Sequence, residues 1–253
     1  MTGKLHGRRA LIYGGGTGLG LACAEAMLAS GATVFITSRR IEKLREAQSL
    51  LGADRLGLAS GDFTLEADVA SVTEAAVDFL GGIDTLVVSS GTSAIGSILT
   101  TSRAQFEEVI TTNLVGPFLA LRSVVPHLIR SAPSSIILIA SVVAVAAMKD
   151  RVAYISSKAG LLGMTRALAL DLAEHQVRVN AISPSLVLTE LAQEILSREA
   201  DGPATLARRH AQHPLGRLGK PQEIGATAVY LASTDSGWMT GQNLVIDGGL
   251  SIQ

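Results

Sequence analysis

The fold of this chain is decided by one stretch near its start, Arg9-Ala10-Leu11-Ile12-Tyr13-Gly14-Gly15-Gly16-Thr17-Gly18-Leu19-Gly20. Residues Arg9–Tyr13 predict a buried strand, and the apolar residues over Gly18–Ser30 predict a helix. Glycines between a strand and a helix let the backbone turn tightly and approach a pyrophosphate, while the helix N-terminus supplies N–H groups. A glycine-rich turn alone is equally typical of an ordinary tight loop. Its place between a strand and a helix favours a dinucleotide site.

Strand and helix patterns alternate along the rest of the chain. Further strands are predicted at Ala32–Thr37, Leu56–Gly61, Thr85–Ser89, Ile136–Ala140, Arg178–Ile182 and Asn243–Ile246. Helices are predicted at Ile41–Leu51, Glu66–Leu80, Arg103–Ile129 with Pro117 as a candidate kink, Ala153–Glu174, Glu190–Arg198 and Pro221–Ser233. Apolar strands separated by helices indicate a parallel sheet covered on both faces. We therefore expect an α/β, doubly wound Rossmann-type fold in a single domain over residues 1–253.

Composition narrows the class of protein. The chain has 253 residues, 47% hydrophobic and 17% charged, and its net charge of −1 gives no general attraction to nucleic acid or an anionic membrane. No uninterrupted apolar run approaches the ~18 residues of a membrane span. The one cysteine, Cys23, excludes an intramolecular disulfide. We expect a cytoplasmic protein with no membrane or nucleic-acid partner.

The histidines show no spacing typical of a metal site. They are His6, His127, His175, His210 and His213. We expect no metal, and we interpret His210 and His213 as surface residues of a loop, with contact to an anionic substrate as the alternative.

The segment over about residues 185–219 interrupts the strand–helix pattern. It holds Gly202-Pro203 and the basic residues Arg208 and Arg209, which we interpret as solvated surface arginines, with contact to an acidic or phosphorylated substrate group as the alternative. Long irregular insertions in compact domains are often binding loops. We interpret this one as a substrate loop and a mobile lid centred near Glu199–Leu206, with a solvated surface excursion as the alternative.

The end of the second predicted strand bears on the choice of nucleotide. NAD sites usually place an acidic residue there, about 20 residues after the glycines, to bind the ribose 2′-hydroxyl. This chain instead has Ser38-Arg39-Arg40, and the next acid, Glu42, already lies in the following helix. Guanidinium groups match the geometry of a 2′-phosphate. The sequence therefore favours NADP(H), with NAD(H) as the alternative and a solvated arginine pair as the non-functional interpretation.

A second motif, Tyr154-Ile155-Ser156-Ser157-Lys158, indicates proton transfer. Residues four apart lie on one face of a helix, and an ammonium close to a phenol favours the phenolate. The motif follows Ser141, which ends an apolar run over Ile136–Ala140. A Tyr-x-x-x-Lys motif alone occurs by chance on many helices. Together with the glycine turn it predicts hydride-transfer chemistry.

These residues make the chain resemble the short-chain dehydrogenase/reductase family over nearly its whole length. The resemblance is carried by Gly14, Gly18, Gly20, Asp62, Asn113, Ser141, Tyr154, Lys158 and the segments Val179–Pro184 and Gly241–Gly249. Three departures are Tyr13 for the usual threonine, Val88-Ser89-Ser90-Gly91 for Asn-Asn-Ala-Gly, and Ser185 for a glycine. The resemblance implies a doubly wound fold and a nicotinamide cofactor. It also implies a homotetramer built mainly on the helices Arg103–Ile129 and Ala153–Glu174.

The resemblance also implies roles. Tyr154 would be the general acid for ketone reduction and the base for alcohol oxidation, Lys158 would lower its pKa and hold the nicotinamide ribose, and Ser141 would bind the substrate oxygen. Asn113 would hold a water of a proton relay, Asp62 would meet the adenine amino group, and Val187 and Thr189 would anchor the carboxamide. The implied cofactor contacts are Gly14, Gly16, Thr17, Gly18, Leu19, Gly20, Ser38, Arg39, Arg40, Asp62, Phe63, Ser90, Gly91, Asn113, Tyr154, Lys158, Pro184, Val187 and Thr189.

The substrate is left open by the sequence. The family lines its pocket with the segments that here are Thr92–Ile95, Val142–Lys149 and Leu186–His213, and Val143–Ala147 suggest an apolar wall. The pattern is similar to that of 3-oxoacyl-acyl-carrier-protein reductases, but also to sugar, polyol and xenobiotic ketone reductases. We expect a small carbonyl or alcohol substrate. The alternative is a catalytically idle member that binds nucleotide and regulates a partner.

Overall fold

The computed structural model describes residues 3–52, 54–189 and 202–253. Within them, one seven-stranded sheet has the order β3-β2-β1-β4-β5-β6-β7, and each neighbouring pair is parallel. The strands are β1 Arg9–Tyr13, β2 Thr33–Ser38, β3 Leu56–Ser60, β4 Thr85–Val88, β5 Ser134–Ile139, β6 Val177–Pro184 and β7 Asn243–Ile246. The doubly wound Rossmann-type prediction is confirmed, with strand bounds within two residues of those expected.

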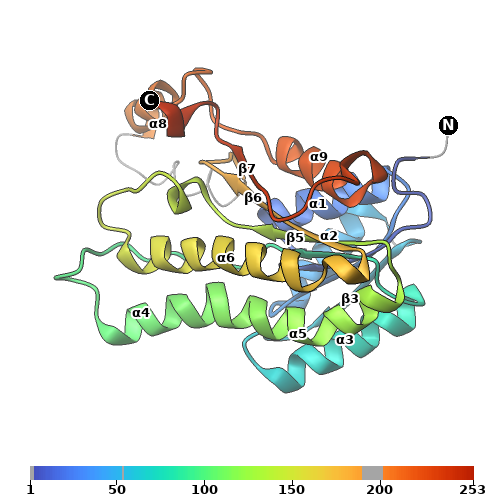
Figure 1. Ribbon diagram of the computed structural model, residues 1–253. Coiled ribbons are helices and arrows are strands. Elements are labelled where there is room, and N and C mark those ends of the chain that lie inside the picture. The colour runs from blue at the N-terminus through green and yellow to red at the C-terminus, as the bar shows by residue number, and fades with distance from the viewer. Residues whose placement is uncertain (1–2, 53, 190–201) are drawn as a thin grey trace.

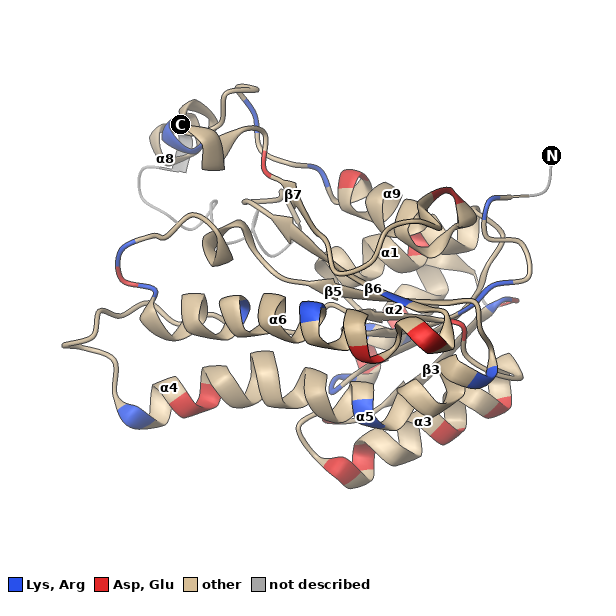
Figure 2. Ribbon diagram, in the orientation of Figure 1, with Lys and Arg blue, Asp and Glu red and all other residues tan. Residues whose placement is uncertain are grey.

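Helices cover both faces of the sheet (Figure 1). One face carries α3 Glu66–Leu80, α4 Arg103–Ile110, α5 Gly116–Arg130 and α6 Val152–Asp171, and the other carries α1 Gly18–Ala29, α2 Ile41–Leu51 and α9 Pro221–Ala232. Alternate strand residues supply the two cores: Leu11 faces the α3–α6 side, whereas Ile12 faces the α1 side. Because both faces are buried, the strands are apolar throughout, as the sequence indicates. Figure 2 shows most charged residues on the outer faces of the helices and in loops.

The long helix predicted over Arg103–Ile129 is interrupted. After α4, residues Thr111–Val115 form a π-helical turn, η1, in which the Gly116 N–H donates to the Thr111 carbonyl. Pro117 lacks an N–H, so the Asn113 carbonyl cannot receive the usual α-helical bond from position 117. The irregularity therefore lies just before the proline, and π turns of this kind recur at functional sites.

Two further helix predictions are revised. The helix expected over Ala153–Glu174 ends at Asp171 and is followed by a short 3₁₀ turn, η3 Ala173–His175. Within the segment expected to be irregular, α8 Gly202–Ala211 is a helix that begins at Gly202-Pro203, and proline suits a first turn because its missing N–H would be unpaired there. The expected helix Glu190–Arg198 lies outside the described residues, and the mobile lid stays a prediction.

The 28-residue helical run Arg103–Arg130 contains an 18-residue stretch with a mean hydropathy of 1.3, which matches a membrane span by length and composition. The helical run is not an uninterrupted apolar run of the kind that the sequence was expected to lack, because Asn113 and Arg122 lie within it. In the fold this run packs on α3 and α6, and its buried residues Ala120, Leu121, Val124 and Leu128 belong to the core. Packing against the sheet accounts for these apolar residues.

Candidate active site

The glycine turn after β1 has no room for larger residues. Gly14 donates its N–H to the Thr37 carbonyl over 2.8 Å and has φ +79°, a conformation that favours glycine. A Cβ on Gly20 would lie 2.2 Å from the Gly14 carbonyl oxygen. At the start of α1, the N-cap residue Thr17 makes no side-chain capping bond. The first N–H groups of α1 are thus left for an anion.

The strand end after β2 carries positive charge. Arg39 and Arg40 are exposed, and the Ser38 hydroxyl makes only a long 3.4 Å bond to the Arg40 carbonyl. Burial alone would raise the pKa of Asp62, but hydrogen bonds from the Thr64 hydroxyl and N–H, together with the Arg39 charge, hold this pKa below its usual value. Asp62 is therefore an ionised acceptor beside Arg39.

The predicted proton-transfer pair lies on the first turns of α6. The Lys158 Nζ donates to the Ile139 carbonyl over 2.9 Å and lies 5.9 Å from the centroid of the Tyr154 ring. Burial lowers the pKa of Lys158 to about 8. Burial also raises the pKa of Tyr154, and a hydrogen bond with Ser141 and the charge of Arg151 offset this only in part.

This pKa direction corrects one sequence expectation. The sequence predicted that Lys158 lowers the pKa of Tyr154, whereas without a bound cofactor the net shift of Tyr154 is upward. The ammonium sits under the ring and faces a backbone carbonyl, so removal of the phenol from water is the larger effect. A free enzyme at neutral pH therefore keeps Tyr154 protonated.

Ser141 stands where β5 gives way to a 3₁₀ turn, η2 Val142–Ala144. The side chain of Ser141 is buried, accepts a 3.4 Å bond from the Val143 N–H and lies close enough to the Tyr154 hydroxyl to lower its pKa. Two hydroxyls that meet in this way can donate to one carbonyl oxygen, where negative charge develops during reduction.

Asn113 sits in the π turn and is fully buried. Its Oδ1 accepts from the Thr92 N–H at 2.8 Å, and its Nδ2 donates to the Thr92 carbonyl at 2.8 Å and to Ser157 Oγ at 3.0 Å. A Cβ on Gly91 would lie 3.2 Å from Asn113 Oδ1 and 3.5 Å from Lys158 Nζ. The Asn113 side chain thus joins the loop after β4 to α6, and a water relay would have to use its backbone carbonyl. That relay stays a prediction.

The segment that follows β6, with Ser185, Val187 and Thr189, lines the end of the site opposite the arginines. Val187 pairs with Gly219 across the two ends of the insertion, and a Cβ on Gly18 would lie 3.8 Å from Thr189. The Ser185 hydroxyl lies 3.0 Å from His213 Nε2, while His213 Nδ1 lies 2.7 Å from the Arg209 carbonyl. The interpretation of His213 as a surface residue is wrong, because only 3% of it is exposed.

A family model described as enoyl-(acyl carrier protein) reductase matches residues 14–251. D-threitol dehydrogenase of Mycolicibacterium smegmatis is 36% identical over 99% of this chain and 95% of its own. This chain belongs to the short-chain dehydrogenase/reductase family. Another relative is 3-oxoacyl-[acyl-carrier-protein] reductase of Thermotoga maritima, 34% identical over 98% of this chain and 100% of its own. The ligand-free aldohexose dehydrogenase of Thermoplasma acidophilum superposes with a TM-score of 0.89 at 30% identity, covering 100% of this chain and 97% of that one.

As a short-chain dehydrogenase/reductase, the chain is an NAD(P)-dependent oxidoreductase, and its cavities fit the dinucleotide. A cavity of about 590 Å³ is lined by the glycine turn and by Ser90, Gly91, Ser185, Val187 and Thr189. A second, of about 320 Å³, shares Gly14, Thr17 and Arg40 and continues to Ser38, Arg39 and Phe63. Most of the predicted contacts thus line these two cavities, which together extend from the arginines to Thr189. In the described part of the chain, the predicted contacts that line neither cavity are Gly20, Asp62, Asn113, Tyr154, Lys158 and Pro184.

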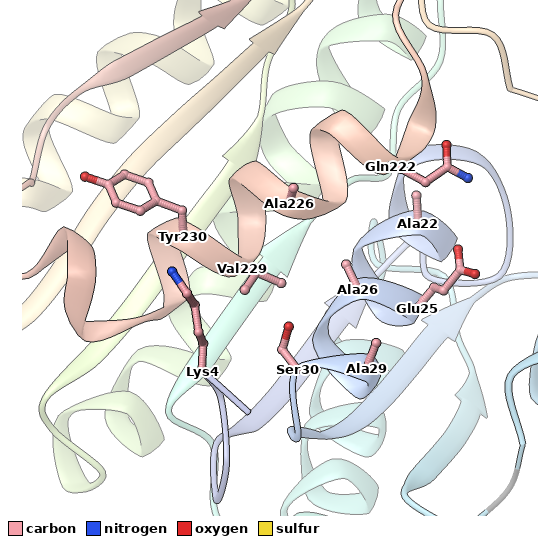
Figure 3. A pocket seen from close by; sticks show the side chains of 10 residues that line it. All are labelled: Lys4, Ala22, Glu25, Ala26, Ala29, Ser30, Gln222, Ala226, Val229 and Tyr230. Atoms are coloured by element: carbon pink, nitrogen blue, oxygen red, sulfur yellow. The ribbon is translucent and has the colours of Figure 1, made fainter. Parts of the chain in front are cut away.

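A further cavity shares no lining residue with the two dinucleotide cavities. It measures about 480 Å³ between α1 and α9 and is lined largely by Ala22, Ala26, Ala29 and Ala226, with Lys4 and Glu25 at its border (Figure 3). It holds no proton-transfer pair, and Tyr230 extends away from α1. Among the described residues, no group of three or more His, Cys, Asp or Glu side chains is placed to hold a metal ion.

Proposed function

We propose that this chain is an NADP(H)-dependent oxidoreductase that interconverts a ketone or aldehyde with a secondary alcohol. The observation that carries the proposal is the closeness of the Tyr154 and Ser141 hydroxyls, with Lys158 buried beside the Tyr154 ring. This arrangement stands at the same edge of the sheet as the glycine turn. The nicotinamide cofactor supplies or takes the hydride when bound.

The residues of the chain would supply position and the proton. Ser141 and Tyr154 donate to the substrate oxygen, and Tyr154 passes it a proton during reduction. A phenol with a raised pKa holds that proton at neutral pH, which suits reduction. In the oxidation direction Tyr154 has to lose its proton first. The positive charge of Lys158 then stabilises the phenolate, and its Nζ would hold the nicotinamide ribose.

The preference for NADP(H) is supported by Arg39 and Arg40, which are exposed where β2 ends and which line the smaller of the two cavities. Arg39→Ala is expected to raise the Kd of NADPH by about 10- to 100-fold, since a hydrogen bond to a charged group contributes roughly 1.5–3 kcal/mol. The Kd of NADH is expected to change little. Titration of both cofactors measures this.

A matched control for charge is Arg45→Ala. Arg45 is exposed on α2 and lines neither cavity, so its loss removes one positive charge and leaves the 2′-phosphate contact. Equal wild-type kcat/KM for NADH and NADPH would overturn the NADP(H) preference.

Two substrate classes are supported by relatives: 3-oxoacyl thioesters, from the Thermotoga maritima reductase, and small sugars or polyols, from the threitol and aldohexose dehydrogenases. The wall beside Ser141 includes the buried Val142 and Val143, which favours a substrate with an apolar part. A catalytically idle, regulatory member is the second candidate, and the assembled pair of Ser141 and Tyr154 speaks against it. A panel of ketones and alcohols, assayed with both forms of both cofactors, separates these outcomes.

A further inference from the structure

Arg151 is held rigidly at the start of α6. Gly96 donates its N–H to the Asp150 carbonyl over 2.9 Å, and Val152 donates to the Gly96 carbonyl over 3.4 Å. These bonds join the loop after β4 to the loop after β5 and form an isolated bridge between Gly96 and Arg151. Arg151 caps the helix three residues before Tyr154, a spacing that brings two side chains to one helix face.

The guanidinium of Arg151 has no partner among the described residues. Its Nη1 atom is buried without a hydrogen bond, and no described carboxylate forms an ion pair with it. Other arginines differ in this respect: Arg103 pairs with Glu107, and Arg217 with Glu223. A buried charged donor without an acceptor is unfavourable, so an anion is expected to complete the group.

The charge of Arg151 reaches the reaction centre. It lowers the pKa of the Tyr154 hydroxyl, the group that would donate to the substrate oxygen, against the larger effect of burial. Because Arg151 precedes Tyr154 by three residues at the start of α6, an anion bound at Arg151 would lie on the helix face that carries Tyr154.

The cavity beside Arg151 has both apolar and polar side chains, and the polar ones include Ser97, Asp150 and Ser156. It measures about 440 Å³ and is lined by Arg151 together with Ile98, Met148, Lys149 and Ile155, among others. Ile98 and Met148 are exposed there, and the charged residues Lys149, Asp150 and Arg151 follow one another directly before α6. Such a wall suits a ligand with a short apolar body and one anionic end.

We propose that Arg151 is a specificity-determining residue that binds an anionic group of the substrate, so that the enzyme acts on oxo acids and hydroxy acids in preference to neutral ketones and alcohols. The inference rests on the proposed function. The shared chemistry is a carboxylate or a phosphonate-like phosphorus oxyanion a few bonds from the carbonyl, and Arg151 would bind it in bidentate fashion.

The test compares each acid with its neutral ester. Levulinate and methyl levulinate form one pair, and 2-oxopropylphosphonate and its dimethyl ester form the other; kcat/KM is measured for each with NADPH. Wild-type enzyme is expected to prefer the acid in at least one pair, and the pair that responds identifies the anion. In Arg151→Gln the acid-to-ester ratio is expected to fall about 10- to 100-fold, because a charge-assisted hydrogen bond is lost, while ester turnover stays within about threefold.

Two variants sharpen the comparison. Arg151→Lys keeps the charge and is expected to retain part of the acid preference. Arg166→Gln removes an exposed cation on α6 that lines neither this cavity nor the two dinucleotide cavities, and is expected to leave the ratio within about twofold. An acid-to-ester ratio that is the same in wild type and Arg151→Gln, or a wild type that prefers both esters, would overturn the proposal.

A binding measurement separates this inference from the proposed function. Levulinate and 2-oxopropylphosphonate are added to enzyme with NADP⁺, and the shift in Tm is recorded. Wild type is expected to show a rise that Arg151→Gln lacks. If no ketone is turned over with either cofactor, the proposed function fails, and the Tm comparison still decides whether Arg151 binds an anion: equal shifts in the two proteins contradict it.

Discussion

Burial sets the protonation of the two residues at the centre of the site. Lys158 has almost no exposed surface and a pKa near 8, while the pKa of Tyr154 is raised above its ordinary value. Both groups therefore hold their protons at pH 7 in the free enzyme. The position of Lys158 below the Tyr154 ring keeps a positive charge close to a proton donor without a direct bond between them.

The buried Lys158 is expected to make stability depend on pH. Its pKa falls from 10.5 in the unfolded chain to about 8 in the fold. Between these values the unfolded chain holds the extra proton, so rising pH favours the folded state. The free energy of unfolding of wild type minus that of Lys158→Met should therefore increase from pH 8 to 10.5, by on the order of 3 kcal/mol.

Urea unfolding of both proteins at several pH values measures this difference. Groups common to the two proteins cancel in the subtraction. A difference that stays constant from pH 8 to 10.5, or that falls, would show that Lys158 is not desolvated in the fold.

At the scale of single residues, the sequence located the reacting groups but not their state. Tyr154 and Lys158 could be paired because residues four apart lie on one helix face. Ser141 could be placed near them because it follows a predicted strand of the same sheet. The direction of the Tyr154 pKa shift depends on how far the fold buries the ring, and segments distant in the sequence determine that burial. The contact of Ser185 with His213 joins residues 28 positions apart, so no local pattern reported it.

At the scale of elements, two irregular features position the site. The π turn η1 directs Asn113 inward to hold the loop after β4, and the bridge between Val187 and Gly219 closes the base of the insertion. The sequence predicted a helix over both α4 and α5 because their apolar periodicity is continuous. The π turn η1 departs from the α-helical repeat over only five residues, Thr111–Val115, which is too short to change the apolar pattern of the sequence. The turn is recognised only from the fold, in which the Asn113 side chain bonds Thr92 and Ser157.

The bond between Ser185 and His213 is expected to stabilise the insertion. Ser185→Ala leaves the Nε2 of a buried histidine without a partner, and this should lower the free energy of unfolding by about 1–3 kcal/mol. Thermal unfolding measures the change. Ser49→Ala is the matched control, because Ser49 is exposed on α2 and a surface substitution of this kind usually stays within about 0.5 kcal/mol. Equal Tm values for Ser185→Ala and wild type would contradict the stabilising role.

At the scale of the whole molecule, exposed apolar side chains gather on the helices of one face. Phe106 on α4, Val115 in η1, Phe118 on α5 and Leu170 on α6 are 37%, 40%, 50% and 81% exposed. Figure 1 shows α4 and α5 running beside α6. The resemblance to the family implies association through the same helices. We propose that this face joins subunits of a homotetramer.

Light scattering at micromolar concentration measures the assembly, and a tetramer is the expected result. Phe118→Arg with Leu170→Arg should yield smaller species, because each places a charge in the proposed interface. Leu50→Arg is the control, since Leu50 is 71% exposed on α2, on the opposite face of the sheet. A wild-type monomer, or a tetramer that survives Phe118→Arg with Leu170→Arg, would contradict the proposed interface.

The central claim is that Tyr154 carries the proton during hydride transfer. The most direct measurement compares wild type and Tyr154→Phe for NADPH oxidation with the best ketone of the panel, alongside the Kd of NADPH for each protein. Phenylalanine keeps the ring above Lys158 and loses only the hydroxyl that lies close to Ser141. We expect turnover to fall by at least about 100-fold, the scale of general acid catalysis, with the Kd changed by less than about threefold. A Tyr154→Phe enzyme with near-normal kcat would contradict the account.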